Sequence, residues 1–212
     1  LKEINPSGAG YCYRNRATQY ERLREFDKAL ADYDSAIALE PENANRYKNR
    51  AWFYYEQKEY NKSIVDFTRA TELDPDDADN WRCLGYVYHL GIKDYEKALN
   101  YYEKSLEVDS TYVDAINSRA LIYVEQKKYD LAIKEYDRGI ALKEIDPNGA
   151  AYCYGNRATQ YERLREYDKA LADYDSAIAL EPENALRYYN RAWFNYEQKE
   201  YNKSIVDFTR AT

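Results

Sequence analysis

The side chains most often used in catalysis or metal binding are few in this chain, and their spacing suits neither role. His89 is the only histidine, so no histidine pair can hold zinc, and no Ser-His or Cys-His nucleophile arrangement stands out. Acids such as Asp32 and Asp34 lack the alternating oxygen ligands and terminal Glu of a calcium loop. Gly8 and Gly10, which we expect in a turn, are not followed by the Gly-Lys-Ser/Thr of a phosphate-binding loop. The sequence therefore predicts no enzyme activity, no catalytic residue, no metal site and no cofactor.

A different pattern of charged residues recurs along the chain: an arginine followed sixteen residues later by an acid. The pattern occurs at Arg16/Asp32, Arg50/Asp66, Arg119/Glu135, Arg157/Asp173 and Arg191/Asp207. Where Leu84 stands at the arginine position, Tyr101 stands at the acid position, so the two residue types come and go together. We expect each arginine to form a planar, two-bonded pair with its acid and so to join two helices. The alternative is that the arginine stem packs while its head reaches water.

These charged residues belong to an internal repeat. The triplet Asn-Arg-Ala begins at Asn15, Asn49, Asn156 and Asn190, and its place is taken by Ser118-Arg119-Ala120 and Cys83-Leu84-Gly85. The successive spacings are 34, 34, 35, 38 and 34 residues. A fixed period of this length is the signature of a repeat architecture in which stacked units bury a continuous core.

Each repeat is predicted to hold two helices. In the first repeat, apolar side chains at helical spacing mark a helix of about 13 residues, and a second helix runs from about Asp27 to Leu39. Pro41 follows, with equivalents at Pro75 and Pro182, and proline disfavours helical geometry in the residue before it. The small residues Ala17, Ala29 and Ala36 allow the two helices to approach closely.

The pattern resembles the tetratricopeptide repeat, and Trp81, Gly85, Tyr88, Ala98 and Tyr102 match that family best. The resemblance implies an all-α fold, a right-handed α-solenoid of stacked antiparallel helix pairs with about five and a half to six units. The first helix of each pair (helix A) is then expected to line the concave side, and the second (helix B) the outer side.

The expected domain is one array over 1–212. Its repeats, numbered 1 to 6, are 10–43, 44–77, 78–112, 113–150, 151–184 and the incomplete 185–212. Residues 1–9 match the tail of a preceding repeat, so we expect this to be part of a longer array. Repeat 3 carries one extra residue near 92–93. Repeat 4 carries an insertion at 143–145, which predicts a longer second helix or a wider turn.

Composition excludes some classes of partner. The formal net charge is −7, with 31 basic and 38 acidic side chains interspersed, which disfavours a nucleic-acid binder. No stretch of 18 consecutive apolar residues occurs, so the sequence predicts no membrane span. Three cysteines cannot all pair with one another, which favours a reducing, cytoplasmic location. The 26 tyrosines against five phenylalanines indicate apolar surface that also needs polar partners, as at a recognition face.

The family resemblance implies that helix A of each repeat carries a peptide-binding groove. The expected groove residues are Arg14, Asn15, Thr18, Arg22, Lys48, Asn49, Trp52, Tyr55, Arg82, Tyr86, Asn156, Tyr189, Asn190 and Trp193. The asparagines share one slot, where an amide could grip the backbone of an extended peptide. The alternative is that they only bond to neighbouring helices. The clamp by which some relatives hold chaperone C-termini fits poorly, because Thr18, Asp79 and Cys83 depart from it.

A larger duplication overlies the repeats: 1–71 and 142–212 align with 63 of 71 residues identical. Of the eight differences, Arg14/Gly155 and Lys48/Tyr189 remove a cation from the second copy. We therefore expect an acidic stretch of a protein or peptide ligand to dock near the N-terminal half. The rival hypothesis is a self-assembling structural array that stacks end to end, since the last helix keeps Ile205 and Phe208 and repeat ends expose apolar faces unless capped.

Overall fold

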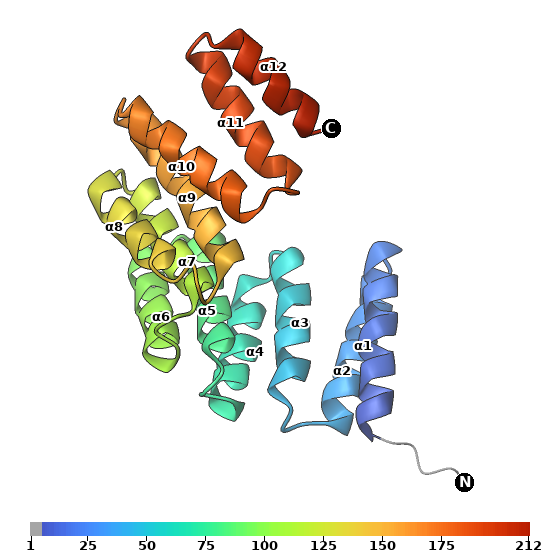
Figure 1. The fold of residues 1–212 in the computed structure, drawn as a ribbon. Helices are drawn as coiled ribbons and strands as arrows, with labels where there is room; N and C mark the ends of the chain where they lie inside the picture. Colours follow the sequence, from blue (N-terminus) through green and yellow to red (C-terminus); the bar gives the residue numbers. More distant parts are fainter. Residues whose placement is uncertain (1–5) are drawn as a thin grey trace. The chain divides into compact units, whose positions relative to one another are not determined.

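The computed structural model describes residues 6–212, and in that range the chain is all-helical, with no strand (Figure 1). The helices A are α1 (Pro6–Arg22), α3 (Ala44–Glu56), α5 (Ala78–Tyr86, continued by the π-helical η1, Val87–Ile92), α7 (Val113–Glu125), α9 (Pro147–Arg163) and α11 (Ala185–Glu197). The helices B are α2 (Phe26–Leu39), α4 (Tyr60–Leu73), α6 (Tyr95–Val108), α8 (Tyr129–Ile140), α10 (Tyr167–Leu180) and α12 (Tyr201–Arg210).

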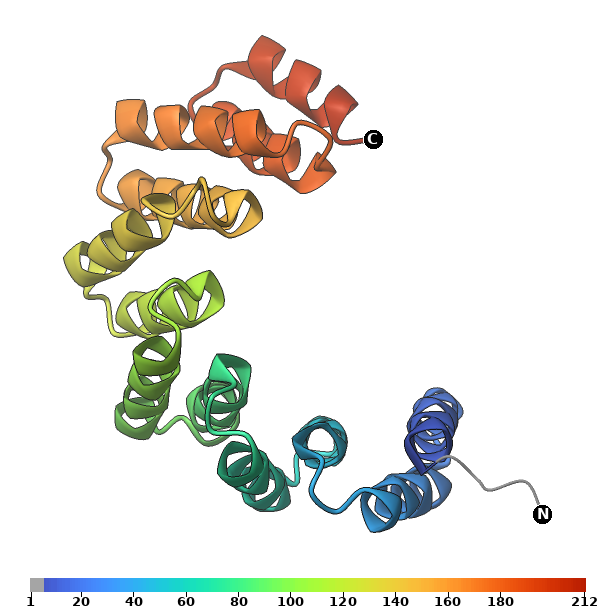
Figure 2. The ribbon, with the colours of Figure 1, turned by 60° about the horizontal axis from the view of Figure 1, so that its bottom comes forward.

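The chain divides into two compact units, Leu1–Ser110 and Thr111–Thr212. Within each unit, consecutive helices A and B pack as a hairpin, and each hairpin packs against the next (Figures 1 and 2). The expected stack of antiparallel helix pairs is therefore present within both units. Residues 1–5 of the predicted tail 1–9 lie outside the described residues, and 6–9 form the start of α1.

Small residues allow the two helices of a hairpin to meet. Ala17 and Ala29 are fully buried at the contact of α1 with α2, where they form one cluster with Tyr33 and Phe53. Ala36 is 1% exposed, as the sequence predicted. The second copy repeats this arrangement with a cluster of Ala158, Ala170, Tyr174 and Phe194. A larger side chain at these alanines would overpack the contact, at a cost of about 1–3 kcal/mol.

Each turn from helix A to helix B is closed by a basic residue with a left-handed backbone. The residues and their φ angles are Arg24 (59°), Lys58 (60°), Lys93 (66°), Lys127 (60°), Arg165 (60°) and Lys199 (62°). In the first of these turns the Glu25 amide donates to the Tyr20 carbonyl at 2.9 Å, the six-to-one bond that ends a helix with a left-handed residue. All six of these side chains are exposed.

The start of the next helix A is also set locally. After the proline, the side chain of Asn43 accepts a hydrogen bond from the Asn45 amide at 3.0 Å, and that of Asp77 accepts from the Asp79 amide at 2.9 Å. These are N-terminal helix caps, which satisfy amides that lack a partner within the helix.

The two irregular repeats are accommodated differently. In repeat 3 the extra residue falls where α5 passes into η1, and a π-helical turn holds one more residue than an α-helical turn. In repeat 4 the insertion forms a wide turn at 141–145, while α8 is 12 residues long and so is not lengthened. Of the two outcomes expected for the insertion, the wider turn is the one observed.

One sequence expectation is wrong. Gly8 and Gly10 lie inside α1 and not in a turn, because the helix begins at Pro6. The matching helix α9 begins at Pro147, whose missing amide hydrogen costs nothing at the first helical position, and Asp146 caps it. Helix A is thereby one turn longer in repeats 1 and 5 than in repeats 2, 4 and 6.

Candidate protein-binding surface

The predicted arginine–acid pairs are present. In four repeats the arginine Nε and Nη2 atoms donate to the two carboxylate oxygens of the acid sixteen residues later, over 2.6–2.8 Å, at Arg16–Asp32, Arg50–Asp66, Arg157–Asp173 and Arg191–Asp207. Arg119 reaches Glu135 at 3.2 Å through Nη2. The pair hypothesis, and not the solvated alternative, therefore describes how helix A is tied to helix B.

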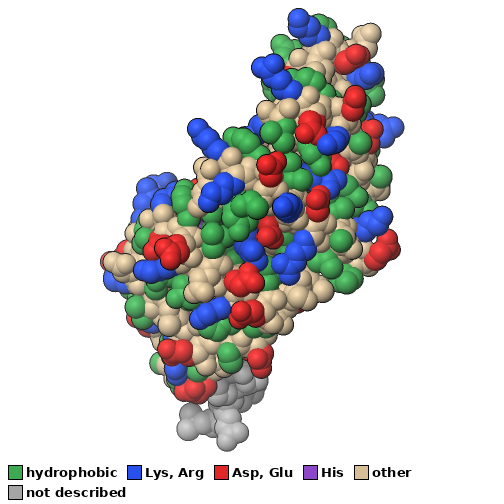
Figure 3. All heavy atoms as spheres, turned by 90° about the vertical axis from the view of Figure 1, so that its left-hand side faces the viewer, with side chains coloured by type: hydrophobic (Ala, Val, Ile, Leu, Met, Phe, Trp, Pro, Cys, Tyr) green, Lys and Arg blue, Asp and Glu red, His purple; other side chains and the backbone are tan. Residues whose placement is uncertain are grey.

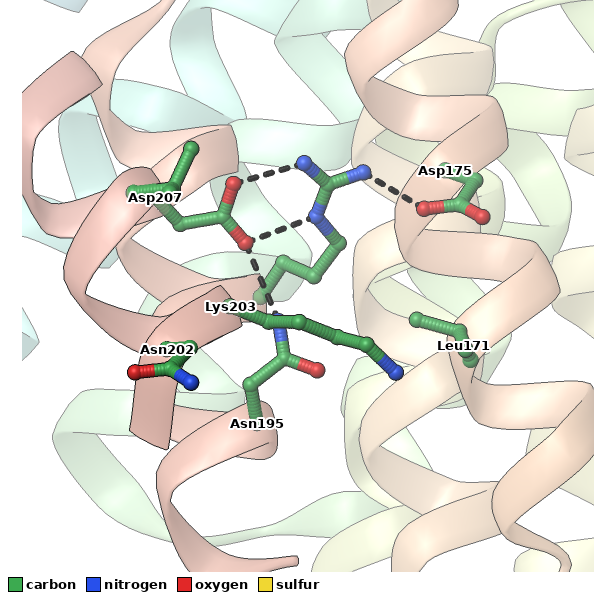
Figure 4. Close-up of a pocket in the computed structure, with 8 residues that line it drawn as sticks. Leu171, Asp175, Asn195, Asn202, Lys203 and Asp207 are labelled. Atoms are coloured by element: carbon green, nitrogen blue, oxygen red, sulfur yellow. Dashed lines mark hydrogen bonds and ion pairs between the residues drawn. The ribbon is translucent and has the colours of Figure 1, made fainter. Parts of the chain in front are cut away.

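Several of these arginines bind a second acid that was not predicted from the sequence. The Nη1 atom of Arg50 donates to Asp34 of the preceding repeat at 2.6 Å, and Arg191 reaches Asp175 at 2.6 Å in the same way (Figure 4). Arg157 makes the equivalent bond to Asp137. The sequence held a signal for this second acid. Thr68 stands at the position equivalent to Asp34 in the repeat that precedes Leu84, so the acid is missing where the arginine is missing.

Each such arginine therefore links three helices and fixes the spacing of adjacent repeats. The side chain of Asp66 is only 4% exposed, and that of Arg50 is 21% exposed. Hydrogen bonding to Asp66 raises the pKa of Arg50. In the second copy, burial raises the pKa of Asp173. This network positions the helix-A residues that the sequence assigned to binding.

In the N-terminal unit the structure brings three predicted groove residues together. The rings of Trp52, Tyr55 and Tyr86 form a cluster with centroid separations of 5.6, 5.4 and 5.4 Å. Trp52 also packs edge-on to the buried Phe67 at 5.2 Å, and Tyr55 contacts Tyr60 at 5.5 Å. All three predicted residues are partly exposed, so the cluster presents rigid aromatic area contributed by α3 and α5.

Two of the predicted cations lie beside one another but are neutralised. The Nζ atom of Lys48 lies 3.2 Å from Asp77 and 3.1 Å from Asp79, and Arg82 donates to Asp79 at 3.0 Å. Burial alone would raise the pKa of Asp79, but Arg82 and Lys48 lower it to about 2. The part of the surface expected to be cationic here is therefore a balanced polar network.

The first repeat keeps exposed positive charge. Arg14 and Arg22 are both exposed on α1, and Arg14 donates to the Asn15 side-chain oxygen at 3.1 Å. The Thr18 hydroxyl donates to the Arg14 carbonyl within the same helix at 3.1 Å. The basic character that the sequence assigned to the N-terminal half thus resides mainly in α1.

The four equivalent asparagines are all partly exposed. Asn15 bonds its own helix neighbour, and Asn156 has a buried Nδ2 with no hydrogen-bond partner among the described residues. The Oε1 of Gln160, one turn further along α9, is also buried without a partner there, although its Nε2 donates to the Asn156 carbonyl at 3.0 Å. Both atoms are closed off from the surface, so a ligand would meet the exposed remainder of Asn156.

The end of the C-terminal unit presents the most exposed part of the predicted surface. Tyr189 is 46% exposed and Trp193 is 45% exposed. Their rings lie 6.2 Å apart, and both pack edge-on to Phe208 of α12. Tyr196 contacts Trp193 at 5.5 Å and is 48% exposed.

Other functional signals are sparse in the described part of the chain. Within 6–212 no three His, Cys, Asp or Glu side chains gather as metal ligands would. None of the described helices has the length and apolar character needed to cross a bilayer. On the face shown in Figure 3, acidic and basic side chains alternate without a patch of one sign.

Solved structures share this fold at low sequence identity. A tetratricopeptide repeat protein from Parabacteroides merdae matches 99% of this chain and 80% of its own, with 24% identity and a TM-score of 0.69. Yeast Tom70 matches 87% of this chain and 39% of its own, with 20% identity and a TM-score of 0.77. YrrB, described as a TPR protein with an unusual peptide-binding site, matches 82% of this chain and 88% of its own, with 24% identity and a TM-score of 0.54.

Curated relatives match a short segment. The Hsp70-Hsp90 organizing protein of Triticum aestivum is 38% identical over 48 residues, and Hsp70-Hsp90 organizing protein 2 of Arabidopsis thaliana is 35% identical over 48 residues. Each match spans 23% of this chain and about 8% of the relative.

Family models match along most of the chain. Those described as tetratricopeptide repeat match residues 10–43, 88–150 and 151–184, and one described as TPR repeat matches 53–91. The paired helices and these matches agree: the chain belongs to the tetratricopeptide repeat family.

Proposed function

We propose that the chain is a non-enzymatic scaffold that binds an extended segment of another protein along helix A of its repeats. The observation that carries this proposal is the partly exposed ring cluster of Trp52, Tyr55 and Tyr86 beside the polar network of Lys48 and Asp79. Aromatic side chains supply large, rigid contact area, and a polar rim beside them orients a ligand. Family membership and the peptide-binding site described for YrrB support the same role.

The four asparagines of the shared slot would hold the ligand's main chain. An amide offers two donors and one acceptor, which suits peptide groups whatever their side chains. The partial exposure of all four asparagines supports this assignment. Asn15, whose oxygen accepts from Arg14, would contribute its Nδ2 group.

The acidic part of the ligand is proposed to lie against the first repeat. Arg14 and Arg22 are exposed there, whereas Lys48 and Arg82 are balanced by Asp77 and Asp79. The double variant Arg14→Gly with Lys48→Tyr carries the residues of the second copy at these two positions. It should bind an acidic peptide more weakly. An unchanged affinity would contradict the charge assignment.

The curated relatives are named for organising Hsp70 and Hsp90, and we do not extend that role to this chain's surface. In this chain Asp79 already pairs with Lys48 and Arg82. In repeat 3, Cys83 stands at the position that the asparagine holds in repeats 1, 2, 5 and 6. A ligand carboxylate placed there would have to displace Asp79. We therefore propose an internal, extended segment as the ligand in preference to a terminal carboxylate.

The test begins with a peptide-display selection on the full chain. Binders would then be measured against a variant with Asn15, Asn49, Asn156 and Asn190 changed to Ala. A matched control changes Asn61 and Asn100, exposed residues of helices α4 and α6, to Ala. Loss of at least about tenfold in affinity for the groove variant only, with helicity unchanged, supports the proposal. Equal affinity for both variants would rule out the asparagine slot.

Self-association is a second candidate, favoured by one observation. On the last hairpin, Ile205 is 63% exposed and Trp193 is 45% exposed, whereas the equivalent Ile64 and Trp52 are partly buried by repeat 3. Sedimentation over a concentration series would test this candidate. A mass that rises with concentration, and that stays monomeric after Ile205→Lys with Phe208→Ser, would favour end-to-end stacking over ligand binding.

A further inference from the structure

A pocket of ≈ 520 Å³ lies between α10 and the last hairpin, α11 and α12, of the C-terminal unit (Figure 4). Three helices contribute to its walls: Leu171 and Asp175 come from α10, Arg191 and Asn195 from α11, and Asn202, Lys203, Val206 and Asp207 from α12. Its volume is in the range of sites that hold small molecules or single side chains. Asn195 and Trp193 are two residues apart on α11, about 200° around the helix, so the pocket is not part of the proposed peptide surface.

The internal repeats show what normally fills this space. Four residues after the arginine position, which Leu84 occupies in repeat 3, repeats 1 to 5 all carry a tyrosine (Tyr20, Tyr54, Tyr88, Tyr123 and Tyr161), and repeat 6 alone has Asn195. This Tyr54-to-Asn195 change is one of the eight differences between the duplicated blocks. The pocket thus coincides with the one position where the tyrosine is missing.

In repeats 2 and 5 the ring lies between two cations. The ring of Tyr54 has the Arg50 guanidinium carbon 5.8 Å and the Lys62 Nζ 5.2 Å from its centroid. The ring of Tyr161 has Arg157 and Lys169 at 5.6 and 5.2 Å. Cations at these distances from an aromatic face are attracted to it, and guanidinium groups also stack on rings.

Repeat 6 keeps the two cations that flank the tyrosine ring in repeats 2 and 5. Arg191 is held in place by Asp207 and Asp175, as Arg50 is by Asp66 and Asp34. Lys203 stands at the position of Lys62 and lines the pocket. The apolar wall is also kept, because Leu171 corresponds to Leu30, which packs with Tyr54 against the core of the first hairpin.

The substituting residue leaves the space open and does not collapse into it. Asn195 is 3% exposed, and its Nδ2 donates to Asp207 at 3.1 Å. Its side-chain oxygen points away from Asp207, to the side where Lys203 and Leu171 lie (Figure 4). The Asn195 amide oxygen, Lys203 and Arg191 therefore surround a space whose apolar lining is Leu171 and Val206.

We infer that this pocket binds the aromatic side chain, tyrosine or phenylalanine, of a partner polypeptide, which takes the place of the missing internal tyrosine between Arg191 and Lys203. Among the described residues, neither the Tyr54 hydroxyl nor the Tyr161 hydroxyl has a hydrogen-bond partner, so the ring, and not the hydroxyl, is the feature recognised. The pocket adds an aromatic anchor site that is independent of the helix-A surface.

The test is an NMR titration of the full chain with N-acetyl-tyrosinamide and N-acetyl-phenylalaninamide. Saturable shifts at the Asn195 side-chain amide, the Leu171 methyl groups and Lys203 are expected with both probes. The saturated analogue N-acetyl-cyclohexylalaninamide should bind about two- to fivefold more weakly, because it lacks the cation–π attraction. Equal binding of the saturated ring would overturn the aromatic assignment, and absence of saturable shifts would overturn the site.

The duplicated block supplies matched variants. Asn195→Tyr restores the residue that the other repeats carry, so it should fold normally and weaken the probes at least about tenfold. Tyr54→Asn should open a second site, with new shifts at Leu30 and Lys62 and a stoichiometry that rises from one to two. Undiminished binding to Asn195→Tyr would contradict the proposal. Neither variant touches the asparagine slot, so these results are separable from the test of the proposed function.

Discussion

Repeats 2 and 6 carry nearly the same sequence in different surroundings. Residues 44–71 and 185–212 differ only at Asn45/Leu186, Lys48/Tyr189 and Tyr54/Asn195. In repeat 2, Trp52 is partly buried against Tyr86 of the next repeat, whereas in repeat 6 its counterpart Trp193 is 45% exposed.

The comparison teaches that the neighbouring repeat, more than the local sequence, decides what a side chain does in this fold. Lys48 contacts Asp77 and Asp79 at the start of the next helix A, whereas Tyr189 packs against Trp193 and Phe208 of its own hairpin. A repeat protein interacts mainly with its immediate neighbours, so identical residues acquire different roles at different places in the stack.

The largest effect is expected from removing the acid that ties the helices together. Asp66→Ala leaves Arg50, which is 21% exposed, with Asp34 alone, and should cost about 3 kcal/mol of unfolding free energy, near the lower end for buried pairs. Asp207→Ala removes the same pair from repeat 6 and should mainly loosen the last hairpin.

Urea unfolding measures the first effect, and hydrogen exchange of α11 and α12 measures the second. A loss below about 1 kcal/mol for Asp66→Ala would show that the pair behaves as an ordinary surface ion pair. Equal global losses for the two variants would contradict the dependence on neighbours.

A smaller difference is expected for the two tryptophans. Trp52→Ala removes contacts with Tyr55, Phe67 and Tyr86 and should cost about 2–3 kcal/mol. Trp193→Ala removes a half-exposed ring and should cost less than about 1 kcal/mol. Thermal unfolding of both variants checks the ranking, which would be wrong if Trp193→Ala were the more destabilising change.

Exchanging Tyr54 and Asn195, the residues that differ at this position of repeats 2 and 6, should change the free energy of unfolding by about 1 kcal/mol in opposite directions. Asn195→Tyr gains ring burial between Arg191 and Lys203, beyond what it loses with the Asn195–Asp207 hydrogen bond, and should stabilise the chain. Tyr54→Asn should destabilise it by removing the equivalent contacts. Denaturant midpoints of the two variants that shift in the same direction would contradict the equivalence of the sites.

The smallest effect at neutral pH concerns the duplicated cysteines. Cys12 is exposed, while Cys153 is buried with Val113 and Tyr136 of repeat 4. Burial raises the pKa of Cys153 from 9.0 to about 12. The thiol stays neutral in the folded chain where it would ionise in the unfolded one, so its contribution to stability is present below pH 9 and lost as the pH rises towards 12.

Thiol labelling at pH 8 should therefore modify Cys12 rapidly and Cys153 only after unfolding. Mass spectrometry of the labelled peptides separates the two cysteines. Comparable labelling rates in the folded chain would show that repeat 4 does not cover Cys153.

Features that depend on one repeat could be predicted from the sequence. The helix pairs, the buried alanines and the Arg50–Asp66 pair all follow from spacings within a single unit. The different burial of the duplicated cysteines does not follow from one unit: Cys12 is exposed, whereas its copy Cys153 is buried against repeat 4.

Features that depend on the next repeat were not predicted. Lys48 was assigned to ligand binding, yet Asp79 neutralises it, because the start of the next helix A comes within hydrogen-bond reach. The same reason explains the missed bond from Arg50 to Asp34. A pattern within one repeat does not show which side chains contact each other between adjacent repeats. For the second acid the sequence did hold a signal, because Thr68 replaces it sixteen residues before Leu84, where the arginine is also missing.

The most direct test of the central claim uses the three tryptophans as reporters. Trp52 and Trp193 lie on the proposed helix-A surface, whereas Trp81 faces helix B, stacks on Tyr101 and donates to the Pro75 carbonyl at 2.8 Å. Indole NMR signals would be followed while a display-selected peptide is added. We predict that the indole signal of Trp52, of Trp193 or of both shifts and that the signal of Trp81 does not; shifts confined to Trp81 would place the ligand on the opposite face of its helix and contradict the proposal.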